Sequence, residues 1–290
     1  MPPLARHADL RVNREANATL IRHLESGGVR SLLYGGNANF YNIALGEYAS
    51  TLEVLADLAG VDTWVIPSVG PDYGKMMDQA VILRNTSFPT AMALPLGFPA
   101  TPDGVATGLR RFAEAVGKPV LVYIKAENYL SPELVGKLVA DGLVSAIKYA
   151  LVVKDPSQDP YLRALLEHVP AKLVVSGIGE RPAIVHLKEF GLRGFTSGSV
   201  CVGPRGSQKL LRAIQAKQWD EADKLRAPYL PLEDCRDSIS PIRTLHEAVT
   251  LSGIANMGPI LPLLSNLELS LHGRVKAAAT ALLAHDRSLA

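Results

Sequence analysis

The amino-acid sequence predicts an α/β protein, a (β/α)8 or TIM barrel with a C-terminal helical extension. Seven short apolar runs recur along the chain, and their first residues are 23 to 33 residues apart. Each interval has the length of one strand, one helix and two loops, which is typical of right-handed βαβ units with parallel strands. The first run is followed by GGNANF and not by a GxGxxG turn, which favours a barrel over an open nucleotide-binding sheet.

We expect seven of the eight barrel strands at these apolar runs. The remaining strand, the first along the chain, would have to come from MPPLARHADLRV, which is a poor strand because it contains two prolines. We therefore expect the first strand to be short or vestigial. The seven runs cover residues 29–35, 62–69, 88–95, 119–125, 144–150, 171–177 and 194–200.

Helical patterns fill the intervals and continue after the last strand. The segment SPELVGKLVADG (131–142), for example, begins with Ser-Pro-Glu and ends at a Gly, both typical helix boundaries. After residue 205 only helical patterns follow, and no polar linker separates them from the rest. We assign residues 1–205 to the barrel core and residues 206–290 to the last barrel helix plus the helical extension.

Composition and charge exclude several classes of protein. The chain has 290 residues, of which 48% are hydrophobic and 20% charged, so it can bury a large core. A net charge of +2 without a basic run argues against nucleic acid or an anionic membrane as partner. The two cysteines form no CxxC motif, and no stretch resembles a signal peptide or a membrane span, which predicts a cytoplasmic protein. The seven histidines form no ligand-like cluster or hydrolase triad, so neither a metal nor another cofactor is expected.

One lysine stands out because it interrupts an apolar strand. Lys148 lies in VSAIKYA (144–150), near the carboxyl end of the predicted strand, where TIM barrels keep their active sites. Desolvation lowers the pKa of a lysine by up to roughly 3 to 5 units, and a neutral amine is the nucleophile that Schiff-base chemistry requires. The preceding strand carries Tyr123, whose phenol both donates and accepts protons, and Lys125 on the same face.

Each of these side chains also has a purely structural interpretation. A lysine at a strand end often buries its stem while its amine reaches water, and a tyrosine in a strand is often a core residue. Lys125 is a rival nucleophile, but it ends its strand and is expected to meet solvent or a substrate carboxylate.

These residues, taken together, resemble a known family. Lys148 in VSAIKYA, Tyr123 in PVLVYIKAENYLSPE, the helical segment SPIRTLHEAVTLSG and the later MGPILPLL are similar to the dihydrodipicolinate synthase / N-acetylneuraminate lyase family. The resemblance covers most of the chain. It implies that Lys148 forms an imine with pyruvate or another 2-oxo acid, that Tyr123 relays protons, and that the barrel is a homo-oligomer, a tetramer or a dimer.

The resemblance is incomplete at the turn that binds the substrate carboxylate. The family has Gly-Thr-Thr-Gly-Glu there, and this chain has GGNAN (35–39), without either hydroxyl. The main-chain N–H groups of Gly36 and Asn37, together with the Asn37 amide, still offer donors to a carboxylate. We therefore expect Gly36 and Asn37 to contact the substrate.

Two further positions depart from the synthases of this family. Leu96 and Gly97 stand where the synthases have a tyrosine pair, and Asn128 replaces their substrate-binding arginine. Because an amide lacks the charge and the bidentate geometry of a guanidinium group, Asn128 is expected to bind a different second substrate. These differences predict a divergent member, with dihydrodipicolinate synthesis itself as an alternative activity.

The last two strands are followed by the glycine-rich segments SGIGERP (176–182) and TSGSVCVGP (196–204). Many TIM barrels bind phosphate at this place, although tight turns need glycine as well. By the resemblance, Gly177 and Thr196 match main-chain positions that line the 2-oxo acid pocket.

The sequence thus predicts a Schiff-base-dependent lyase, an aldolase or a dehydratase, that acts on pyruvate or a sugar-derived 2-oxo acid. Lys148 forms the imine, Tyr123 relays protons, and the loop KAENY (125–129) sets the second substrate. Two other hypotheses stay open: a phosphate-binding isomerase barrel, and a catalytically silent protein that binds a 2-oxo acid.

Overall fold

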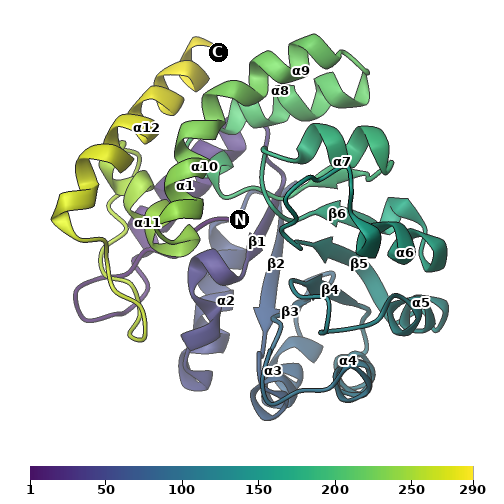
Figure 1. Cartoon of the computed structure of the whole chain (residues 1–290). Helices are drawn as coiled ribbons and strands as arrows, with labels where there is room; N and C mark the ends of the chain where they lie inside the picture. The colour runs from purple at the N-terminus through teal and green to yellow at the C-terminus, as the bar shows by residue number, and fades with distance from the viewer. Residues whose placement is uncertain (290) are drawn as a thin grey trace. The chain divides into compact units, whose positions relative to one another are not determined.

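A computed structural model describes residues 1–289, and within them seven β-strands form one sheet in the order β1 to β7 (Figure 1). Strands β2 to β7 pair in parallel with their sequence neighbours. Each of the seven apolar runs contains one strand, so the predicted strand positions are confirmed. The strands are β1 (Ser31–Tyr34), β2 (Trp64–Val69), β3 (Met92–Ala93), β4 (Val120–Ile124), β5 (Val144–Tyr149), β6 (Val174–Ser176) and β7 (Gly194–Phe195).

Two of the strands are much shorter than the apolar runs that predicted them. In β3, Pro89 and Pro95 flank the strand and lack the N–H group that a ladder needs, which confines pairing to Met92–Ala93. In the last run the chain leaves the sheet after Phe195 and forms the 3-10 helix η4 (Ser199–Cys201).

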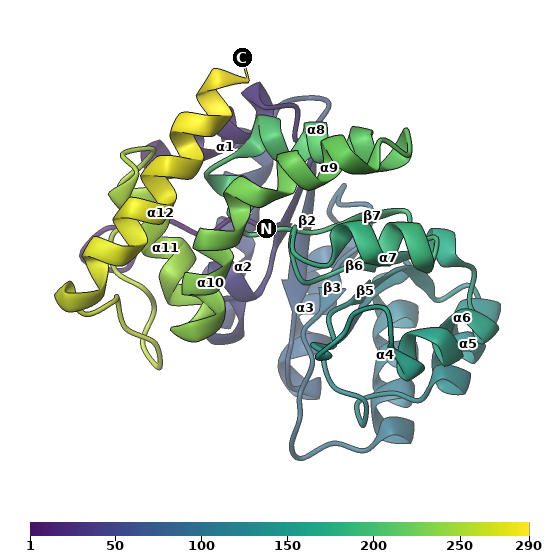
Figure 2. The ribbon, with the colours of Figure 1, turned by 45° about the horizontal axis from the view of Figure 1, so that its top comes forward.

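The chain divides into two compact units, and each is described by itself. The second unit comprises Ile66–Ile178 and Pro182–Thr196. In this unit α4, α5 and α6 lie side by side outside the strands β3 to β6 (Figures 1 and 2). Its helices are α3 (Tyr73–Arg84), α4 (Pro102–Val116), α5 (Pro132–Ala140), α6 (Pro160–His168) and α7 (Ala183–Glu189), with the 3-10 helix η3 (Ala171–Leu173).

Three helices of the second unit begin in the same way. The side chains of Thr101, Ser131 and Asp159 each accept a main-chain N–H from the first turn of the following helix, and a proline comes next. A polar N-cap followed by proline is a strong local start signal, because the cap satisfies one free N–H and proline has none. Local sequence therefore determines where these helices begin.

The first unit contains residues 1–65, residues 179–181 and the chain from residue 197 onward. Helices α10, α11 and α12 pack together in it around a core that includes Tyr229, Leu232 and Cys235 (Figure 2). The division after residue 205 that we expect from the sequence stays a prediction. The elements of the first unit, besides β1 and η4, are α1 (Arg14–Ser26), η1 (Gly36–Ala38), η2 (Phe40–Asn42), α2 (Leu45–Leu58), α8 (Pro204–Gln215), α9 (Trp219–Arg226), η5 (Ala227–Tyr229), α10 (Leu230–Ser238), α11 (Pro241–Leu251) and α12 (Leu269–Ser288).

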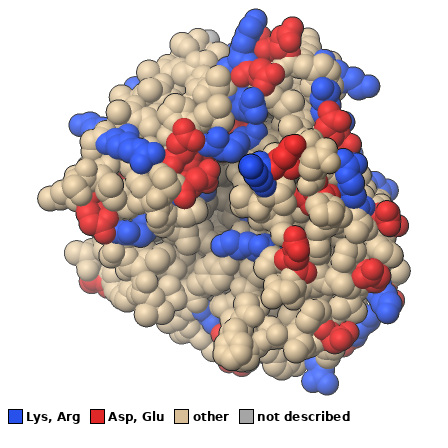
Figure 3. Space-filling view, viewed as in Figure 1, with Lys and Arg blue, Asp and Glu red and all other residues tan. Residues whose placement is uncertain are grey.

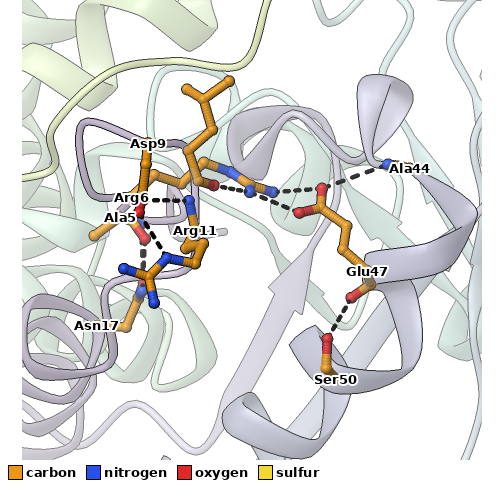
Figure 4. Close-up of polar contacts among 9 residues, drawn as sticks. Ala5, Arg6, Asp9, Arg11, Asn17, Ala44, Glu47 and Ser50 are labelled. Carbon is orange, nitrogen blue, oxygen red and sulfur yellow. Dashed lines mark hydrogen bonds and ion pairs between the residues drawn. The ribbon is translucent and has the colours of Figure 1, made fainter.

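The segment before α1 forms no strand and is held by polar contacts instead (Figure 4). The guanidinium of Arg6, which is only 2% exposed, donates to both carboxylate oxygens of Glu47 at 3.0 Å. The Asn17 side chain bonds both the N–H and the C=O of Ala5 at 3.0 Å. These contacts, and an isolated antiparallel bridge between Arg6 and Val12, fix a segment that forms no regular strand.

Charged side chains of both signs are interspersed on the face shown in Figure 3. This distribution lacks the single-sign stripe that is typical of nucleic-acid binding. Among residues 1–289, no helix is both long enough and apolar enough to cross a membrane.

Candidate active site

Lys148 and Tyr123 lie opposite each other on the paired strands β5 and β4. The Nζ atom of Lys148 lies 3.5 Å from the centroid of the Tyr123 ring. Lys148 is 1% exposed, so its amine is removed from bulk water, whereas Tyr123 is half-buried. The structure thus brings together an amine nucleophile and a phenol at the carboxyl ends of two neighbouring parallel strands.

The opposite face of β5 is anchored by Tyr149, the residue next to Lys148. Its hydroxyl donates to Asp159 at 2.6 Å, and its ring stacks on Tyr161 with 6.0 Å between centroids. Burial, and then the hydrogen bond to Asp159, raise the pKa of Tyr149 well above its ordinary value, so the phenol stays a donor. Because successive side chains of a strand point to opposite faces, this anchor fixes β5 while leaving Lys148 on the other side.

Gly177 is the residue that makes room for the lysine stem. A Cβ atom at this position would lie 2.8 Å from the Tyr149 carbonyl oxygen and 3.0 Å from Cγ of Lys148. The Gly177 N–H donates to the same carbonyl at 2.6 Å. We predicted that Gly177 lines the substrate pocket, and that role stays a prediction, but the packing around Lys148 alone already requires a glycine here.

Thr196 follows the last residue of β7 and is fixed by its main chain. Its N–H donates to the carbonyl of Ser176 at 2.7 Å. Its Oγ1 atom is buried, yet it has no hydrogen-bond partner among residues 1–289. Most buried hydroxyl groups in proteins are paired, so this one is a candidate contact for a bound ligand.

The loop after β4 presents polar side chains to solvent. Lys125, Glu127 and Asn128 are exposed, whereas Tyr129 is 8% exposed. Burial therefore distinguishes the two lysines that the sequence offered as nucleophiles, because only Lys148 is withdrawn from water. Lys125 and Asn128 are available to a substrate that enters from solvent.

The predicted carboxylate turn belongs to the first unit and forms the 3-10 helix η1. The Asn37 amide donates to the carbonyl of Met1 at 2.8 Å, so this side chain is already engaged. The N–H groups of Gly36 and Asn37 begin the helix, where N–H groups have no intrahelical acceptor. The turn therefore offers these main-chain donors and the second N–H of the Asn37 amide, and a contact of Gly36 and Asn37 with a substrate stays a prediction.

The glycine-rich loop after β6 contains a group that the sequence analysis missed. The N–H of Glu180 donates to Oε1 of Glu233, a residue of α10, at 2.9 Å. An added Cβ at Gly179, which has φ +97°, would lie 2.2 Å from the same oxygen. A carboxyl group of the chain thus occupies a loop N–H that a phosphate would use. Nothing local in the sequence marks Glu233, because it looks like an ordinary helical glutamate.

A separate apolar cavity of about 660 Å³ lies beside α3 and α4 in the second unit. None of the predicted site residues lines it, and Arg111 is its single charged lining residue among those that the structure describes. A cavity without a buried nucleophile does not fit imine chemistry, so we place the candidate site at Lys148. The lining includes Tyr73, Met76, Leu94, Leu96, Val105 and Tyr129.

No group of three or more His, Cys, Asp or Glu side chains in the described part of the chain is arranged to hold a metal ion.

The sequence matches no protein-family model and no curated protein. Solved structures do resemble this fold. Dihydrodipicolinate synthase from Oceanobacillus iheyensis matches with a TM-score of 0.84 and 19% identity, over 97% of this chain and 94% of that chain. The synthase from Bacillus clausii matches with a TM-score of 0.84 and 20% identity, over 99% and 96%. YagE, a prophage protein of the dihydrodipicolinic acid synthase family from E. coli K12 in complex with pyruvate, matches with a TM-score of 0.82 and 19% identity, over 99% and 97%.

At these identities the likeness concerns the fold. It confirms the predicted TIM barrel with a C-terminal helical extension, and this is the fold of the family that the sequence resembles.

Proposed function

We propose that the chain is a divergent member of the dihydrodipicolinate synthase family and a Schiff-base-dependent lyase for pyruvate or a sugar-derived 2-oxo acid. The observation that carries the proposal is the position of Lys148. Its amine is buried near the carboxyl end of β5 and lies 3.5 Å from the Tyr123 ring centroid. The fold shared with YagE, which binds pyruvate, supports the class of substrate.

The reaction begins with the neutral amine of Lys148, the form in which nitrogen has a free lone pair. The nitrogen lone pair attacks the keto carbon, and the carbonyl π electrons move to oxygen, which takes up a proton. The resulting carbinolamine loses that oxygen as water, while nitrogen supplies the electron pair that forms the C=N bond. Tyr123 donates and accepts the protons that these steps move, because a phenol has both capacities.

The protonated imine then accepts electrons from the substrate. Removal of the proton from the substrate hydroxyl and cleavage of the C–C bond to the carbon that bears it release an aldehyde and leave an enamine, which takes up a proton at carbon to give an imine again. Loss of a β-hydroxyl as water, after removal of a proton from the carbon between, uses the same electron sink. Hydrolysis of the imine returns the amine of Lys148 in both cases, so one site supports an aldolase or a dehydratase.

Substrate contacts follow from the donors around the site. In this proposal the Thr196 hydroxyl and the peptide at Gly177 bind the 2-oxo acid. By the resemblance to the family, the N–H groups of Gly36 and Asn37 bind a substrate carboxylate. The exposed Lys125 and Asn128 meet the second substrate. Because Asn128 cannot form the bidentate contact of a guanidinium group, these residues favour an activity other than dihydrodipicolinate synthesis.

A phosphate-dependent isomerase is less well supported. The N–H of Glu180 is already bonded to the carboxyl group of Glu233, and Glu180 itself is fully buried at the end of the same loop. Two acidic side chains at this place disfavour the binding of a phosphate.

The setting of the protein is also part of the proposal. We place it in the cytoplasm, because Cys201 and Cys235 are buried thiols and form no disulfide. A homo-oligomer, a tetramer or a dimer, follows from the resemblance to the family.

Borohydride reduction in the presence of pyruvate, or of a panel of 2-oxo sugar acids, tests the mechanism. We expect a stable adduct by intact mass, mapped by peptide analysis to Lys148, that is absent in Lys148→Arg and retained in the matched control Lys125→Arg. An adduct on Lys125, or turnover that survives Lys148→Arg, would overturn the proposal. An adduct without turnover of any panel member would identify a silent binding protein instead of a lyase.

A further inference from the structure

Two buried glutamates meet in the first unit. Glu180 lies in the loop after β6 and is 0% exposed, and Glu233 lies on α10 and is 2% exposed. The main-chain N–H of Glu180 donates to Oε1 of Glu233 at 2.9 Å. Both carboxyl groups are thus removed from water. An unpaired negative charge is costly in such a buried environment, so the pair needs a specific arrangement of protons.

Both carboxyl oxygens of Glu180 accept hydrogen bonds from hydroxyl groups. The hydroxyl of Ser197 donates to its Oε2 at 2.7 Å, and the hydroxyl of Ser207 donates to its Oε1 at 2.7 Å. The Ser197 oxygen also accepts the N–H of Val200 at 3.0 Å, so its own proton is free to point at Glu180. The carboxylate therefore joins three pieces of chain: the loop after β6, the loop after β7 and helix α8.

Glu233 is the partner that carries a proton. Its Oε2 atom is buried and has no hydrogen-bond partner among residues 1–289, and a buried carboxyl oxygen without a donor is costly when it carries charge, which favours the neutral form. Burial first, and then the charge of Glu180, raise the pKa of Glu233 well above its ordinary value, against the opposing effect of Arg236. The other titratable groups near the pair are Arg181 in the loop, Cys201 in η4, Tyr229 in η5 and the N-terminal ammonium of Met1, which donates to the carbonyl of Ser197 at 2.7 Å.

We propose that Glu180 and Glu233 share one proton and form a proton-dependent latch that holds the loops after β6 and β7 against α10. Removal of the proton leaves two buried negative charges side by side, which opens the latch. Gly179 is part of the device, since any side chain there would displace the Glu233 carboxyl group.

The latch acts on the candidate site through the chain. Glu180 lies three residues after Gly177, and Ser197 directly follows Thr196. These two glutamates are therefore positioning residues, and their link to catalysis rests on the proposed function. The latch itself does not, and it is tested without any substrate.

Amide hydrogen exchange of the full chain measures opening of the latch, in peptides that cover residues 177–184 and 195–202. The closed latch holds one proton more than the open one. The equilibrium constant for opening therefore increases about tenfold per pH unit between the ordinary pKa of a glutamate and the raised pKa of the pair. We expect this slope in the wild type at pH values above the ordinary pKa of a glutamate, after correction for the intrinsic pH dependence of exchange.

Glu233→Gln is the decisive variant, because its amide keeps an acceptor for the Glu180 N–H and supplies a fixed donor to the Glu180 carboxylate. We expect its protection to be independent of pH, whereas the exposed control Glu221→Gln on α9 keeps the wild-type slope. A flat wild-type profile, or a slope that persists in Glu233→Gln, would refute the latch.

A direct measurement covers the case in which Glu233→Gln does not fold. Infrared difference spectra of the wild type at neutral pH are expected to show the C=O band of a buried protonated carboxyl group, which shifts in heavy water and disappears at high pH together with the protection. Absence of this band at neutral pH would also refute the proposal. Borohydride trapping at Lys148 is unaffected by either failure, so the two proposals are tested separately.

Discussion

Replacing Gly177 with alanine tests whether the lysine stem is held by close packing. The added methyl group would lie 2.8 Å from the Tyr149 carbonyl oxygen, 2.8 Å from Cβ of Ala150 and 3.0 Å from Cγ of Lys148. Two of these neighbours belong to the main chain or directly adjoin it, so the β5–β6 contact has to widen. Overpacking of this kind costs typically about 1 to 3 kcal/mol of unfolding free energy.

The effect on chemistry is expected to exceed the effect on stability. A displacement of a reacting group by about 1 Å lowers a rate by up to about 100-fold. The stem of Lys148 needs to move by a smaller distance, a few tenths of an ångström, to restore ordinary contact with the added methyl group. We therefore expect the rate of borohydride trapping with pyruvate to fall by about 3-fold to 30-fold, with the fold retained. Circular dichroism during urea denaturation and time-resolved intact mass measure the two quantities.

Gly194 on β7 is the matched control. It also lies in a strand of the second unit, and an added Cβ there would meet no atom within 4 Å. Gly194→Ala is expected to leave trapping unchanged and to alter stability by less than about 1 kcal/mol. Equal trapping rates in the two variants would show that the contact with Gly177 does not position the lysine.

Three further predictions concern the residues around the two glutamates and the candidate site. Tyr123→Phe should lower turnover by about 100-fold to 10,000-fold while a 2-oxo acid still binds, because the ring contact stays and the proton relay is lost; steady-state kinetics with binding calorimetry check this, and unchanged turnover would remove Tyr123 from the mechanism. Tyr149→Phe should destabilise the chain by about 1 to 3 kcal/mol, since it leaves an oxygen of the buried Asp159 unpaired, and a loss below about 0.5 kcal/mol in urea denaturation would contradict this reasoning. The raised pKa of Glu233 means that the folded state binds more protons than the unfolded one, whose glutamate titrates near its ordinary pKa of 4.5; stability should therefore fall as pH rises from there toward the folded pKa, and Glu233→Gln should flatten this dependence of the unfolding midpoint.

Local sequence determined the elements and the chemical type of the candidate site. The alternation of apolar runs with helical segments is a property of residues close in sequence, so it placed seven strands without any knowledge of packing. A lysine inside a β-branched run is equally visible, and strand periodicity alone puts Lys148 and Tyr149 on opposite faces. The ends of the elements were less predictable, because pairing in β3 and β7 depends on neighbouring strands and on the path of the chain after them.

Tertiary structure decided which polar side chains are buried and which groups they bond to. The Asn37 amide, which the sequence offered to a substrate, is bonded to the carbonyl of Met1, 36 residues away. Glu180 and Glu233 are 53 residues apart, and no pattern in either segment indicates that they meet. Burial of a polar group and the identity of its partner depend on which segments pack together. The free energy of this packing is the sum of many weak contacts between residues that are distant in the chain. Composition and periodicity reflect only the contacts between residues close in sequence.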